Sequence, residues 1–172
     1  MTPFADLRER GDVWDAVILF VVPTVLLFVG NLPAETRQAF VFSYKNPTML
    51  TGFTAHFVHL TRSHLLVNST SYLVIAPIGY TLAVVSGRRV QYLTAFVATV
   101  LALPVTLSYL NLAFVRPRVG YGFSGVAMGL LGLLTVELFV YAGQIIACLR
   151  DEDAAGMFFA EVALIGAIVR PQ

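Results

Sequence analysis

Polar side chains of types that can do chemistry gather at the starts of two apolar stretches. His64 and Asn68 are four residues apart, so on a helix they lie on one face. Ser124 stands between Gly122 and Gly125 at the start of another apolar stretch, where small neighbours leave its hydroxyl accessible. The first N–H groups of a helix lack intrahelical acceptors, and with the helix dipole they can stabilise an oxyanion. Together these features place an accessible hydroxyl beside backbone N–H groups that could stabilise an oxyanion.

Each feature taken alone also has a structural interpretation. Gly125-x-x-x-Gly129 is typical of a surface on which membrane helices pack closely. An isolated Asn68 is more often a hydrogen-bonding partner between helices than a catalytic group. The chain has three histidines close together, His56, His59 and His64. Without a nearby cysteine or acid they are only weak candidates for metal ligands, so we expect no metal and no cofactor.

The composition excludes a water-soluble domain. Of the 172 residues, 58% are hydrophobic and 12% charged, against roughly 45–50% and 25% in soluble proteins. The abundance of large apolar residues excludes disorder. Eleven bases and ten acids almost cancel, so we expect no nucleic-acid partner. The single cysteine, Cys148, has no second cysteine for an intramolecular disulfide. The sequence predicts an integral, multi-pass membrane protein.

Apolar runs predict four membrane-spanning helices in a single domain, since a span needs roughly 20 apolar residues. They cover residues 13–32, 65–85, 90–115 and 122–149. The first has no small-residue cleavage site after it, so we interpret it as a retained span. A fifth run, 157–169, would reach only about 20 Å as a helix, which predicts a partial fifth helix. Residues 33–63 mix phenylalanines with cations and are expected to lie in the membrane interface.

The order of the spans brings the polar residues to one side. The second and fourth spans are separated by two crossings, so both begin on the same side of the membrane. His64, Asn68 and Ser124 are therefore expected to meet at one depth. Polar groups inside a membrane are costly and commonly mark function.

Two stretches resemble the rhomboid family of intramembrane serine proteases. Residues 56–68, HFVHLTRSHLLVN, are similar to the histidine-rich entry to the family's second core helix. Residues 122–132, GFSGVAMGLLG, are similar to its Gly-x-Ser-Gly motif at the start of the fourth. The resemblance implies an all-α, polytopic transmembrane bundle and a serine endopeptidase that cleaves transmembrane protein substrates in the lipid bilayer.

The resemblance also implies roles for individual residues. Ser124 corresponds to the nucleophile, and His64 and Asn68 correspond to side chains of the oxyanion hole, together with the Ser124 N–H. Gly122 would keep the loop open for substrate, and Gly125 would let its helix pack closely on a neighbour. Water would reach Ser124 through a polar cavity under the preceding loop.

The chain departs from the family pattern at two points. The family's general base is a histidine on a sixth core helix, which residues 1–172 do not reach, so this stretch alone is expected to be an inactive, incomplete domain. Met128 replaces an aromatic that many relatives carry four residues after the serine. Glu137 and Glu161 are expected to be hydrogen-bonded structural residues.

Two other functions are compatible with parts of the pattern. A rhomboid-like pseudoprotease would bind membrane clients without cleaving them, and the missing base favours it, whereas the intact Gly122–Gly125 motif and the His64/Asn68 pair disfavour it. A small transporter or channel would carry polar residues along a whole pore. Here they cluster at one end of two helices, which favours the protease.

Overall fold

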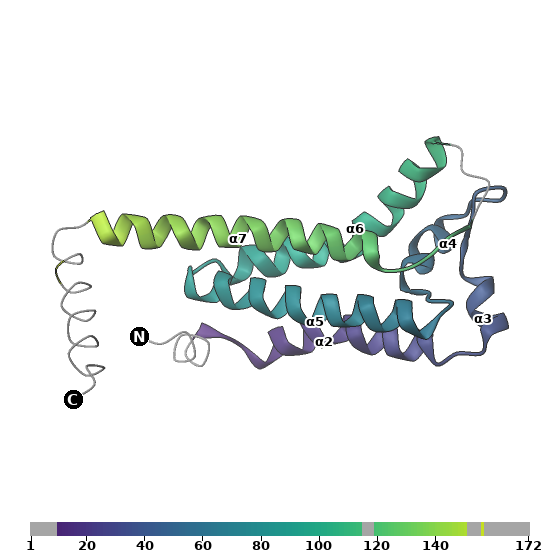
Figure 1. The fold of residues 1–172 in the computed structure, drawn as a ribbon, viewed down its shortest axis with the longest axis horizontal. Coiled ribbons are helices and arrows are strands. Elements are labelled where there is room, and N and C mark those ends of the chain that lie inside the picture. Colours follow the sequence, from purple (N-terminus) through teal and green to yellow (C-terminus); the bar gives the residue numbers. More distant parts are fainter. Residues whose placement is uncertain (1–9, 115–118, 151–155, 157–172) are drawn as a thin grey trace, which may run out of the picture.

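The protein is an all-α bundle with four helices long and apolar enough to cross a membrane. The computed structural model describes residues 10–114, 119–150 and 156. These helices are α2 (Val13–Gly30), α5 (Arg62–Val85), α6 (Arg89–Ala113) and α7 (Ser124–Arg150). They lie along the long axis of the molecule, except that the C-terminal end of α6 bends away from it (Figure 1). The four predicted spans are confirmed, whereas the stretch 157–169 and Glu161 lie outside the described residues.

Local chemistry sets the two helix starts that matter for the site. α5 begins at Arg62, before the predicted residue 65, because the Thr61 hydroxyl caps it by accepting from the His64 N–H. α7 begins at Ser124 and not at residue 122, because Gly122 has φ +100°, which no helical residue adopts. Both candidate catalytic stretches therefore lie in the first turns of their helices.

α5 packs against the three other long helices. Its buried side chains meet those of α2, α6 and α7 in one apolar core, which includes Tyr72, Phe96 and Val126. Two tyrosine hydroxyls also join helices: Tyr72 donates to the Leu19 carbonyl at 2.6 Å, and Tyr92 donates to that of Ala76 at 2.8 Å. In a membrane such bonds satisfy groups that lipid cannot.

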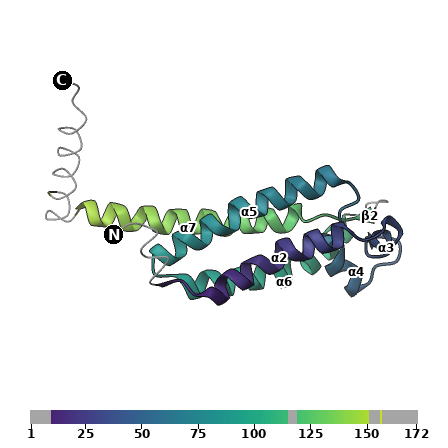
Figure 2. The ribbon, with the colours of Figure 1, turned by 90° about the horizontal axis from the view of Figure 1, so that it is seen from below.

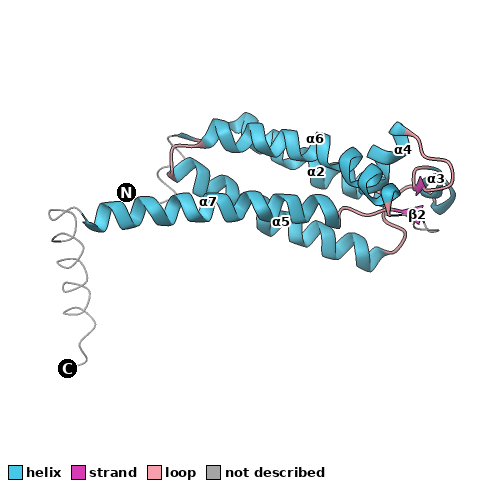
Figure 3. Cartoon of the chain, turned by 90° about the horizontal axis from the view of Figure 1, so that it is seen from above, coloured by secondary structure: helices cyan, strands magenta, loops and turns pink. Residues whose placement is uncertain are grey.

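The segment between α2 and α5 folds over one end of the bundle (Figures 2 and 3). It contains α3 (Ala34–Ala39), β1 (Phe42–Ser43), α4 (Met49–Thr54) and the 3₁₀ turn η1 (Ala55–Phe57). β1 pairs antiparallel with β2 (Val119–Gly120), with Phe42 opposite Gly120. α4 packs on α6. The segment is thereby tied to the turn before α7, and its placement in the membrane interface stays a prediction.

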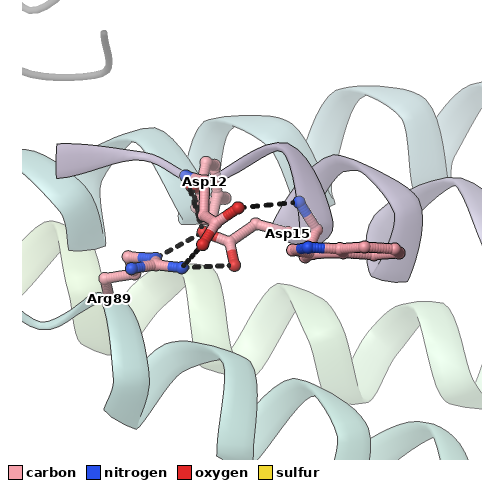
Figure 4. A network of polar contacts seen from close by, with 5 residues as sticks. Asp12, Asp15 and Arg89 are labelled. Carbon is pink, nitrogen blue, oxygen red and sulfur yellow. Dashed lines mark hydrogen bonds and ion pairs between the residues drawn. The ribbon is translucent and has the colours of Figure 1, made fainter. Parts of the chain in front are cut away.

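Two adjacent arginines close the other end of the bundle. Arg89, at the start of α6, binds both carboxylate oxygens of Asp15 at 2.5 and 2.9 Å and lies 3.4 Å from an Asp12 oxygen (Figure 4). Arg88 pairs with the buried Glu137 of α7 at 3.3 Å. The expectation that Glu137 is hydrogen-bonded is confirmed. This end therefore links α2, α6 and α7 through charges.

Candidate active site

A fully buried imidazole joins the two predicted parts of the site. His59, in the loop between η1 and α5, places its Nε2 2.8 Å from the Nδ2 of Asn68 on α5. The same nitrogen lies 3.4 Å from the backbone N of Phe123, the residue before Ser124. Asn68 and the start of α7 therefore meet through one side chain.

His59 lies within the stretch that resembles the family motif, but the sequence alone indicates no role for it. The signal was its spacing, five residues before His64 and nine before Asn68. That spacing crosses from a loop into a helix, so helical periodicity could not place the ring. Burial is the main cause that lowers the pKa of His59 to about 4, and the neighbouring His64 lowers it further. The ring is therefore neutral near pH 7.

His64 lies against the turn that precedes α7. Its ring centroid is 5.0 Å from that of His59 and 6.0 Å from that of Tyr121. A Cβ atom on Gly122 would come within 2.6 Å of the His64 Cε1. The Gly122 N–H donates to the Ala55 carbonyl at 2.9 Å, which fixes the turn. Glycine is thus required here both by its positive φ and by the ring beside it.

Ser124 is exposed and lines a cavity of about 410 Å³. His56, Ser108 and Asn111 share this cavity wall. The Nε2 of His56 lies 3.1 Å from the Ser108 hydroxyl, which donates to the Gly52 carbonyl at 2.8 Å. Burial lowers the pKa of His56, so it is neutral near pH 7. A cavity with polar walls thus adjoins Ser124, and the sequence had not placed His56 in it.

The glycines after Ser124 face α6. A Cβ on Gly125 would lie 2.7 Å from Leu107 Cδ1, and one on Gly129 would collide with Leu103. Gly125 therefore permits the close packing that we expected of it. Met128 is 65% exposed and lies on another face of the helix. Among residues 10–114, 119–150 and 156, no three His, Cys, Asp or Glu side chains gather into a group that could hold a metal.

The sequence-predicted residues thus come to one end of the bundle. His64 is in contact range of Gly122, and Asn68 is linked through His59 to the residue before Ser124. The arrangement offers a hydroxyl at a helix start, with an amide, an imidazole and a polar cavity around it.

Comparison with known proteins agrees with this architecture. A family profile described as Rhomboid domain matches residues 46–172, about three quarters of the chain. The match covers α4 to α7 and leaves α2 outside. Comparisons with curated proteins and with solved structures gave no match. With four apolar helices and this profile match, the chain is a multi-pass integral membrane protein that belongs to the rhomboid family.

Proposed function

We propose that the full-length protein is an intramembrane serine endopeptidase that cleaves transmembrane protein substrates. The observation that carries the proposal is the junction at His59, which holds Asn68 of α5 beside the residue that precedes Ser124 of α7. A nucleophile and an oxyanion donor are thereby kept at one end of two adjacent helices. Such fixed donors supply a large part of the rate in acyl transfer.

In the proposed reaction, the Ser124 hydroxyl attacks the substrate carbonyl carbon and gives up its proton to a general base. The resemblance assigns this base to a histidine of a sixth core helix, which the four described spans do not include. The Ser124 N–H, with Asn68 and His64, would donate to the oxyanion. The amine then leaves with a proton from the base, and water from the adjoining cavity hydrolyses the acyl-enzyme.

A second candidate is a pseudoprotease that binds membrane clients without cleaving them. Rhomboid-family membership is compatible with it, because it does not by itself show cleavage. A serine hydroxyl is a weak nucleophile without a general base. The two candidates differ in whether a bound client is cut.

The test uses the full-length protein reconstituted in liposomes with a transmembrane reporter. The wild type should cleave the reporter, and Ser124→Ala should not, because covalent catalysis needs the hydroxyl itself. Thr135→Val is the matched control, since the Thr135 hydroxyl lies on the same helix and bonds only within it, to the Leu131 carbonyl.

Three results would decide between the candidates. Loss of cleavage in Ser124→Ala alone supports the protease. Reporter binding without cleavage by the wild type supports the pseudoprotease. Equal cleavage by wild type and Ser124→Ala would remove Ser124 as the nucleophile.

A further inference from the structure

We infer that His59 is a positioning residue that orients the Asn68 amide so that its second N–H can serve the oxyanion hole. The inference rests on the proposed function and adds to it a residue with no contact of its own to the substrate. The reason lies at the Nε2 of His59, where one neighbouring group can only donate a hydrogen bond and so fixes what the others must do.

The first step fixes the tautomer of His59. The backbone N–H of Phe123 can only donate, and it points at the Nε2 of His59 at 3.4 Å. Nε2 must therefore carry a lone pair, and the ring proton is on Nδ1. Nδ1 has no hydrogen-bond partner among the described residues, so nothing there demands the opposite tautomer.

The second step fixes the Asn68 amide. Because Nε2 accepts, the Asn68 atom 2.8 Å from it must be the NH₂ group and not the carbonyl oxygen. An amide NH₂ has two hydrogens, of which His59 takes one. The second remains available to another acceptor, which in the proposed reaction is the oxyanion. With the other tautomer of His59, the amide would flip and put its carbonyl oxygen in the place of the NH₂ group, so an oxyanion there would meet an acceptor instead of a donor.

The third step is that His59 is held in place. Its side chain has no exposed surface, and Asn68 is also buried. A guanidinium nitrogen of Arg37, on α3, donates to the His59 carbonyl and anchors its backbone. The His64 ring packs edge-on against it. A buried, anchored ring whose lone pair is engaged by two donors is a support for the site and not a proton carrier.

The first experiment does not depend on activity. Nitrogen NMR of the histidine rings, assigned with His59→Gln, reports which nitrogen carries the proton. At pH 7 the wild type should show Nδ1 protonated and Nε2 free, and Asn68→Leu should shift the Nε2 signal. A protonated Nε2 in His59 would overturn the inference whether or not the protein is a protease.

The second experiment measures cleavage by the full-length protein. Gln at position 59 can put its amide oxygen near the place of Nε2, so His59→Gln should keep most of the activity. His59→Leu removes the acceptor and should lower kcat by about 10²–10³-fold, as loss of one oxyanion donor does. KM should change little, because the substrate does not touch this ring.

A double variant separates positioning from stability. If His59 acts through Asn68, His59→Leu should lower kcat little further once Asn68→Ala is present. Independent, multiplying losses would refute the inference. Thermal unfolding of each variant shows which ones are folded at the assay temperature, and His59→Gln provides the test if His59→Leu is not. An inactive wild type would refute the proposed function and leave the NMR result to decide on His59.

Discussion

Alanine at position 122 tests the geometry that joins α5 to α7. Gly122 has φ +100°, and an added Cβ would lie 2.6 Å from the His64 Cε1. Forcing a side chain into such a backbone region costs about 1–3 kcal/mol. Pushing His64 away from its rotamer adds about 0.5–1.5 kcal/mol. Gly122→Ala should therefore lower the free energy of unfolding by about 1.5–4.5 kcal/mol.

Two other glycines separate the two contributions. Gly87 has φ +71° but open space around it, so Gly87→Ala should show the backbone cost alone, about 1–2 kcal/mol. Gly132 lies within α7 with nothing within 4 Å, so Gly132→Ala should be neutral or slightly stabilising. Thermal and denaturant unfolding in detergent should rank Gly122→Ala as the least stable of the three variants, Gly87→Ala next and Gly132→Ala as the most stable.

The same variants also report on function. Displacement of His64 should reduce kcat of Gly122→Ala by more than its loss of stability explains, whereas Gly87→Ala, at the other end of α5, should cleave like wild type. If Gly122→Ala were no less stable than Gly87→Ala, the contact between Gly122 and His64 would be wrong. If it were unstable but fully active when folded, His64 would have no part in the oxyanion hole.

Three further predictions concern stability. Because burial holds the pKa of His59 at about 4 against an ordinary 6.5, the unfolded chain binds a proton between these pH values that the folded chain does not. The contribution of His59 to the free energy of unfolding should thus be level above about pH 6.5 and fall by about 3 kcal/mol towards pH 4; a pH series of denaturant melts checks this, and His59→Gln should remove this part of the fall and leave the part due to His56, whose pKa burial also lowers. Gly125→Val should destabilise by about 1–3 kcal/mol, since its side chain would enter the space of Leu107, whereas Gly143→Ala, in open space on the same helix, should not. Asp15→Asn removes the charge from a buried side chain that bonds to Arg89, and it should lower the free energy of unfolding by about 1.5–3 kcal/mol. Asp12→Asn is the control: because the Asp12 side chain is half-exposed, the same denaturant melt should show little change in its free energy of unfolding.

Hydropathy was sufficient to predict the four spans, because each must bury or expose to lipid about the same length of apolar chain. Their ends were less predictable. The cap at Thr61 and the positive φ of Gly122 are local features that move a helix start by two or three residues. That Asn68 and Ser124 lie at the same end of the bundle could be predicted, because this depends only on the number of membrane crossings between them.

Long-range pairings could not be predicted from one sequence. Nothing near Phe42 indicates that it pairs with Gly120, and nothing near Asp15 indicates that Arg89 reaches it. His59 belongs to the same class. Its ring contacts Asn68 and Phe123 only because η1 and the loop after it turn the chain back over the start of α7.

The central claim, that Ser124 is the nucleophile, is tested most directly by covalent labelling. The full-length protein in membranes is treated with a fluorophosphonate, digested, and the modified residue is identified by mass spectrometry. We expect one adduct, on Ser124, which is lost when the protein is unfolded before treatment and absent from Ser124→Ala. A protein that cleaves its reporter while its adduct lies on another residue would contradict the account.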